Sequence, residues 1–179
     1  MESNGVEPQF PTSWQAFESR WRELLGIVPA ATYTCDAEGR ITFFNRLAQV
    51  VWGRTPKLRD PSERFCGSYR LHLPDGRPIR HEECWMALAL QEGKAYRARE
   101  IVIERPDGGR TLGEAYAYPL RNERGELVGA VNLVADVTPP VSPSNGNGKS
   151  RDLPLPRDAV VAMIDVALSL SVGMPFEQA

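Results

Sequence analysis

ATYTCDAEGRITFFNRLAQVVWG, residues 31–53, is the stretch that decides the fold. Residues 31–35 are rich in β-branched and aromatic side chains, as strands are, and residues 36–39 (DAEG) have the chemistry of a tight turn. Residues 40–44 (RITFF) predict a second strand, which forms a β-hairpin with the first. Asn45 can cap a helix that begins at Arg46 by accepting one of its unpaired N–H groups, and Gly53 can end that helix.

Three further strands are predicted in the second half of the chain, at residues 95–104, 110–120 and 127–137. Turn sequences at residues 106–109 and 122–125 separate them. The second of these strands carries large side chains on one face and small ones on the other: Leu112, Tyr116, Tyr118 and Leu120 opposite Gly113, Ala115 and Ala117. The third is apolar on both faces, and we therefore expect it at the centre of the sheet.

The middle of the chain predicts a loop-rich stretch and one helix. Residues 54–80 contain four prolines, and residues 65–73 within them are compatible with either a helical turn or a short strand. A helix is predicted from about His81 to Glu92, with Trp85, Leu88 and Ala89 as its apolar face. The fold class is therefore α+β: a five-stranded antiparallel sheet with helices on one face, flanked by an N-terminal and a C-terminal helix.

The flanks differ in composition from this domain, which we place at residues 30–138. Residues 1–11 are polar and are predicted to be disordered. A helix is predicted at residues 12–29, with a stripe of apolar residues at spacings of 3, 4 and 3: Trp14, Phe17, Trp21 and Leu24. The stripe packs either on its own domain or against a second copy, and we favour a homodimer.

A linker is predicted at residues 139–158, because five prolines among Ser, Asn and Gly cannot form a core. Residues 159–179 predict an apolar helix (159–172) and a short tail. A helix that is apolar on nearly all sides requires burial against protein, and this domain, a second copy and another protein are all candidate partners.

Composition excludes several classes of function. A net charge of −2 gives no basic surface for nucleic acid, and no apolar run approaches the roughly 20 residues that span a bilayer. The N-terminus lacks the features of a signal peptide, and three cysteines without framework spacing indicate a reducing compartment. We therefore expect a cytoplasmic protein that binds neither membrane nor nucleic acid.

Residues 21–138 resemble a PAS domain of bacterial sensor proteins. Asn45, Ala48 and Gly53 in the capped helix carry the resemblance, together with the Pro-Asp-Gly turn at 106–108 and residues 121–130. Asp136-Val137-Thr138 is similar to the Asp-x-Thr sequence that couples the sheet to an effector in this family. The resemblance implies a sensor or protein-interaction module with a ligand pocket between sheet and helices, and signal coupling through Asp136 and Thr138.

The sequence departs from this pattern in ways that bear on function. Pro139 and Pro140 interrupt the helical path that leads to a histidine kinase in many such proteins, and both histidines lie inside the sensor-like region. The cysteine-containing sequence of the photoactive flavin-binding subclass is missing. We therefore expect a stand-alone module that signals to another protein of unknown identity.

Both histidines and two of the three cysteines fall within 19 residues, at Cys66, His72, His81 and Cys84. A zinc site, a haem site and a redox-responsive cysteine pair are possible uses, but buried thiols and locally bonded histidines explain such residues more often. We therefore assign no metal and leave the cofactor open. The predicted small-molecule pocket is lined by Cys66, Tyr69, His81, Cys84 and Trp85. Because no phosphate loop, G-x-S-x-G or H-E-x-x-H motif occurs, we predict no enzymatic activity; the alternative is a haem- or redox-dependent site at the Cys/His cluster.

Overall fold

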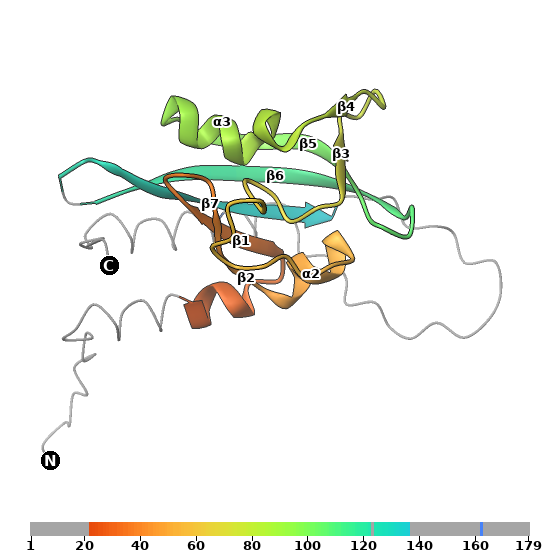
Figure 1. Ribbon diagram of the computed structural model, residues 1–179, viewed down its shortest axis with the longest axis horizontal. Helices are drawn as coiled ribbons and strands as arrows, with labels where there is room; N and C mark the ends of the chain where they lie inside the picture. Colours follow the sequence, from red (N-terminus) through yellow and green to blue (C-terminus); the bar gives the residue numbers. More distant parts are fainter. Residues whose placement is uncertain (1–21, 123, 137–161, 163–179) are drawn as a thin grey trace, which may run out of the picture.

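The computed structural model describes residues 22–122, 124–136 and 162. Within them the chain forms one antiparallel sheet with strand order β2-β1-β7-β6-β5-β3-β4 (Figure 1). The strands are β1 (Ala31–Asp36), β2 (Ile41–Phe44), β3 (Arg70–His72), β4 (Pro78–Ile79), β5 (Tyr96–Glu104), β6 (Arg110–Arg121) and β7 (Leu127–Asp136). The helices with defined bounds are α2 (Arg46–Trp52), the 3₁₀ helix η1 (His81–Glu83) and α3 (Trp85–Glu92).

The predicted α+β fold is confirmed, with two strands more than expected. All five predicted strands form, and β3 and β4 extend the sheet beyond β5 to give seven strands. β3 lies in the segment for which the sequence allowed a helical turn or a short strand. At three and two residues, β3 and β4 are too short to show an alternating pattern, and their pairing with each other and with β5 defines them.

β7 lies inside the sheet, third in the strand order and paired on both edges, as its two apolar faces predicted. It pairs with β1 on one edge and with β6 on the other, which brings the first and last strands of the domain together. The approach of β1 is close at Gly129, where a Cβ atom would lie 2.3 Å from the carbonyl oxygen of Cys35. Glycine is therefore required there to let the two backbones meet.

The two faces of the sheet carry different clusters. On the inner face, β1, β6 and β7 contact α2 and α3 in the main core, which includes Tyr33, Trp52, Met86, Ala115 and Ala130. Figure 1 shows α3 running alongside β5 and β6. The outer face carries the large residues of β6 with their neighbours: Val28, Ala30, Tyr116, Tyr118, Leu120, Val131 and Leu133. The predicted division of β6 into a face of large and a face of small side chains is confirmed.

The helix predicted from His81 to Glu92 is divided at Cys84. The backbone of Cys84 is extended (φ −75, ψ 164), so a 3₁₀ turn precedes it and α3 begins after it. The buried residues of α3 are Met86, Ala87, Ala89 and Leu90, whereas Trp85 and Leu88 are only partly buried. Of the predicted apolar face, Ala89 is buried and Trp85 packs against the core while partly buried, whereas Leu88 is not among the residues that pack there. Because α3 is short and almost wholly apolar, its sequence does not reveal which side faces the sheet.

Several predicted features lie outside the described residues. They are the disordered N-terminus, Trp14, Phe17 and Trp21, Thr138, the linker at 139–158 and, apart from residue 162, the apolar helix at 159–172. Residues 22–27 are helical, with Leu25 buried and Leu24 exposed. The flanking helix and the domain boundaries remain predictions.

The side chain of Asn45 joins three segments of the chain. Its Oδ1 accepts hydrogen bonds from the backbone N–H of Ala48 (3.0 Å), as the predicted helix cap, and from that of Thr32 (3.0 Å) in β1. Its Nδ2 donates to the carbonyl oxygens of Ala30 (2.8 Å), Leu25 (3.3 Å) and Val28 (3.3 Å). One buried amide thereby fixes the start of β1, the start of α2 and the end of the helix at residues 22–27.

Replacing Asn45 with Ala should lower the free energy of unfolding by about 2–4 kcal/mol, because it removes a helix cap and leaves buried backbone groups without partners. Urea unfolding followed by circular dichroism measures the change. Asn122→Ala is the matched control, since Asn122 also accepts two backbone N–H groups but in an exposed turn. Equal effects of the two substitutions would contradict the role assigned to Asn45.

Candidate functional site

A polar pair lies in the middle of the inner face of the sheet. Tyr33 of β1 and Asn132 of β7 are opposite each other in register and are both buried. The Tyr33 hydroxyl donates to the carbonyl oxygen of Phe65 (3.0 Å) and accepts from Nδ2 of Asn132 (3.0 Å). These two bonds orient the amide, and they leave Oδ1 of Asn132 buried with no partner among the described residues.

Aromatic side chains surround this polar pair. The ring of Trp52 meets that of Tyr33 edge to face with centroids 5.0 Å apart, and it meets that of Phe44 edge to face at 5.7 Å. Gly67 lies flat against Trp52, because a Cβ there would come within 2.5 Å of the indole. Burial raises the pKa of the Tyr33 hydroxyl well above its usual range, so this group remains protonated and able to donate.

Three free cysteines, Cys35, Cys66 and Cys84, lie buried in the same part of the core. The thiol of Cys84 contacts the carbonyl oxygen of Phe65 at 3.9 Å, the same oxygen that Tyr33 binds. Burial raises the pKa of all three thiols, that of Cys84 to about 12. Near neutral pH they are therefore uncharged and pack as small apolar groups.

A hydrogen-bonded chain connects Cys66 to His81. The thiol of Cys66 donates to Oγ of Ser68 (3.3 Å), and Ser68 Oγ lies 3.0 Å from Nε2 of His81. Burial lowers the pKa of His81, which favours a neutral imidazole whose Nε2 accepts from the Ser68 hydroxyl. The chain therefore runs from thiol to hydroxyl to imidazole.

His72 belongs to a different group of residues. It lies on β3, and its Nε2 is 3.0 Å from Oε2 of Glu104, which also accepts from Arg110 at 2.7 Å. Hydrogen bonds from Arg110, with a further one from His72, lower the pKa of Glu104. The four residues of the Cys/His cluster are thus divided between two groups. In the part of the chain that the structure describes, no group of three or more His, Cys, Asp or Glu side chains is arranged to hold a metal ion.

The structure brings together three of the five residues predicted to line a pocket: Cys66, His81 and Cys84. Tyr69 lies on the surface, 47% exposed, beneath the guanidinium of Arg70. Trp85 lies at the margin of the inner face, where its ring packs on Tyr96 at 5.6 Å and its Nε1 donates to the carbonyl oxygen of Glu100.

The lining residues predicted from the sequence did not include Tyr33, Asn132, Phe65 or Ser68, although the loop at residues 65–69 was expected to bound the pocket. One signal was available, because Asn132 is the single polar residue inside the apolar run LVGAVNLVA at residues 127–135. Asp136, predicted to couple the signal, is the exposed last residue of β7, four positions beyond Asn132. Its partner in that prediction, Thr138, lies outside the described residues.

The fold and the buried pair define an α+β domain whose inner site is enclosed between a sheet and short helices. The family described as PAS fold matches residues 26–141, well over half of the chain, so this chain belongs to the PAS fold family. The resemblance seen in the sequence is therefore confirmed. PAS domains are generally sensory and signalling modules and not catalysts.

Solved structures are similar to this chain at low sequence identity. A PAS domain from Colwellia psychrerythraea is 20% identical, with a TM-score of 0.50 over 68% of this chain and 98% of that one. The PAS domain of the fruit-fly ELK potassium channel is 15% identical, with a TM-score of 0.51 over 72% of this chain and 99% of that one. At these identities the likeness extends to the fold alone. No curated protein matches the chain, and none of the described helices is long and apolar enough to cross a membrane.

Replacing Tyr33 with Phe should lower the free energy of unfolding by about 1–3 kcal/mol, because the buried Phe65 carbonyl and the Asn132 amide both lose a partner. Tyr69→Phe removes the same hydroxyl from an exposed ring and should change stability by less than about 0.5 kcal/mol. Thermal and urea unfolding of both variants measure the difference. A Tyr33→Phe variant as stable as wild type would show that the hydroxyl contributes nothing to the inner face.

Proposed function

We propose that this PAS domain is a non-catalytic sensor that binds a small molecule at its inner face and passes the change to another protein. The observation that carries the proposal is the Oδ1 of Asn132, which is fixed in orientation by Tyr33, is buried on that face and has no partner within the described part of the chain. A buried acceptor without a donor costs free energy, and a ligand that supplies an N–H or O–H recovers it.

The surroundings restrict the class of ligand. Trp52, Phe44 and Met86 contribute apolar surface, and the nearby thiols are uncharged. A charged ligand would lose its hydration there without meeting a protein group of opposite charge. We therefore expect a neutral, largely apolar or aromatic molecule with one donor group.

The position of Asn132 supports a route for the signal. It lies on β7, which ends at Asp136, the first residue of the Asp-Val-Thr sequence associated with coupling. Because the inner face is closely packed, a ligand can bind only by displacing the side chains that pack against β7. The displacement would then reach the end of β7, where we place the coupling to a partner.

Indole and 1-methylindole test the proposed recognition, since they differ in the N–H donor and have nearly the same apolar surface. Indole should bind more tightly, by about two- to tenfold, the value of one neutral hydrogen bond. The side-chain amide resonance of Asn132 and the melting temperature measure binding. Asn132→Leu should abolish the preference for indole. Equal binding of the two probes would contradict recognition through Asn132.

We further propose that the chain is a homodimer through the stripe of Trp14, Phe17, Trp21 and Leu24. Leu24 is 41% exposed and Ile27, one turn later on the same helix, is 76% exposed, which supports an apolar contact at this end. Three free cysteines support a reducing compartment, and we place the protein in the cytoplasm.

Light scattering of the full-length Leu24→Lys variant tests the dimer. A charge in the apolar contact should shift the protein from dimer to monomer at micromolar concentration. Leu58→Lys is the matched control, because Leu58 is exposed to a similar degree in a loop outside this helix. A monomeric wild type, or a Leu24→Lys variant that stays dimeric, would contradict the proposal.

A further inference from the structure

Residues 59–66, which we call the strap, run along the free edge of β2. β2 is the outermost strand on its side of the sheet. The strap covers this edge and the preceding turn through backbone hydrogen bonds from the N–H of Arg59 to the oxygen of Ile41 in β2 (2.8 Å) and from the N–H of Phe65 to the oxygen of Gly39 in the turn (2.8 Å). Covering an edge in this way protects its unpaired backbone groups from other chains.

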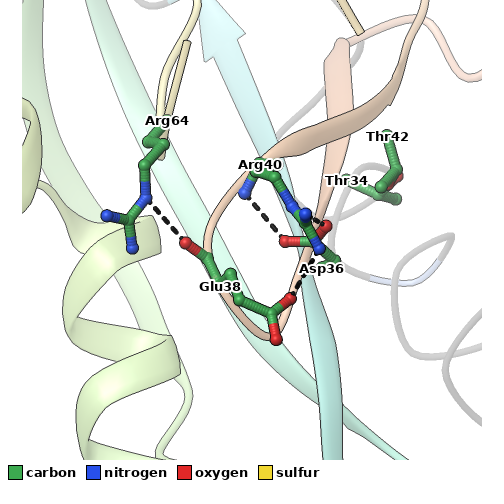
Figure 2. Close-up of polar contacts among 6 residues, drawn as sticks. All are labelled: Thr34, Asp36, Glu38, Arg40, Thr42 and Arg64. Carbon is green, nitrogen blue, oxygen red and sulfur yellow. Dashed lines mark hydrogen bonds and ion pairs between the residues drawn. The ribbon is translucent and has the colours of Figure 1, made fainter. Parts of the chain in front are cut away.

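One polar side chain of the strap, Arg64, reaches the turn between β1 and β2, as Figure 2 shows. Nε of Arg64 donates to the carbonyl oxygen of Glu38 at 2.7 Å. Arg40 stabilises the turn itself: its Nε donates to Oδ2 of Asp36 at 2.7 Å, and its Nη2 donates to Oε2 of Glu38 at 2.9 Å. The Arg64–Glu38 bond is exposed to water, where it contributes little, and the ion pair of Glu63 in the strap with Arg54 is partly buried. The strap is therefore attached mainly by peripheral contacts and less firmly than the core.

The strap is also held in an unfavourable backbone conformation. Of the three residues other than glycine with positive φ in the described chain, two are in the strap: Arg59 (φ 58) and Phe65 (φ 65). A bulky residue adopts the left-handed region only when its surroundings impose it. Release of the strap would relieve this strain and offset part of the lost contacts.

The inner end of the strap reaches the Tyr33–Asn132 pair. The carbonyl oxygen of Phe65 accepts the Tyr33 hydroxyl, and the next residue, Cys66, donates its thiol to Ser68. The ring of Phe65 fills the space above Gly39, where a Cβ atom would lie only 2.3 Å from the ring. Phe65 therefore connects the surface attachment to the buried site.

We propose that the strap opens as a local unit while the sheet stays folded, and that this opening is the path by which a ligand reaches Asn132. The role in ligand access rests on the proposed sensor function. The opening itself is a property of the free protein and can be measured without any ligand.

The cysteines of the full-length protein report the opening directly. Cys66 lies in the strap, whereas Cys35 lies in β1 between two neighbouring strands, and both are buried. Labelling with iodoacetamide in native buffer, read for each cysteine by mass spectrometry, should modify Cys66 at least about tenfold faster than Cys35, since local openings are more frequent than global unfolding. Equal rates at the two sites in wild type would overturn the proposal.

Two substitutions should accelerate labelling of Cys66 more than that of Cys35, whose thiol contacts the Phe65 backbone but whose strand stays paired with β2 and β7. Arg64→Ala removes the bond to Glu38 and should increase the rate for Cys66 about fivefold, whereas Arg124→Ala, in another exposed turn, should not change it. Gly39→Ala displaces the Phe65 ring and should act more strongly. Gly108→Ala is its matched control, because the two glycines have φ of 83 and 82 but nothing lies within 4 Å of a Cβ at Gly108.

The outcomes separate this proposal from the sensor function. If both substitutions accelerate Cys35 and Cys66 equally, the strap opens only with the whole domain and the proposal fails, even if indole still binds. If Cys66 alone is accelerated and indole does not bind, local opening stands while the assigned ligand chemistry fails. If indole binds, its association rate should rise in Arg64→Ala together with the labelling of Cys66, and an unchanged rate would overturn the path of access.

Discussion

The structure depends on the carboxamide of Asn45. An amide group has both an acceptor and a donor end, and here the two ends serve different segments: the oxygen binds the N–H groups of β1 and α2, and the nitrogen binds the carbonyl oxygens of residues 25, 28 and 30. No other side chain of that size offers both functions, since Asp lacks the donor and Leu lacks both. The approach of the chain to β1 and its departure from β2 into α2 are thereby fixed relative to each other. β1 can then pair along β7, which joins the N-terminal hairpin to the rest of the sheet.

The pairing of β1 with β7 places a small polar group inside an apolar core. Asn132 faces Tyr33 across the β1–β7 pair and donates to its hydroxyl, which in turn donates to Phe65; among the described residues, the amide oxygen of Asn132 has no partner. Around them, burial keeps the hydroxyl and the three thiols protonated. The surroundings of this pair are therefore uncharged but retain hydrogen-bonding capacity. This combination suits recognition of a neutral molecule better than acid–base or nucleophilic chemistry, which requires a group poised to ionise near neutral pH.

The strap relates this interior to the surface. Its outer contacts are the exposed bond from Arg64 to the Glu38 carbonyl, the partly buried Glu63–Arg54 ion pair and backbone hydrogen bonds at a sheet edge, and its inner contacts are the Phe65 carbonyl and ring. Weak outer contacts combined with backbone strain make such a segment the part of a domain that opens at the lowest free energy. The same residues that protect the β2 edge therefore also determine how accessible the inner face is.

The sequence by itself determined the local elements: the hairpin at residues 31–44, the cap at Asn45, the end of α2 at Gly53, the turns between β5, β6 and β7, and the interior place of β7. Each follows from preferences within a few residues or from alternation along one strand. Only the tertiary structure decided which side of α3 is buried, that β3 and β4 join the sheet, and that His72 pairs with Glu104 while Cys66 connects to His81 through Ser68. These facts depend on contacts between residues far apart in the chain, such as Tyr33 and Asn132, 99 positions from each other. Local preference carries no information about such partners, because a side chain of a given type could pair equally well with many residues elsewhere in the chain.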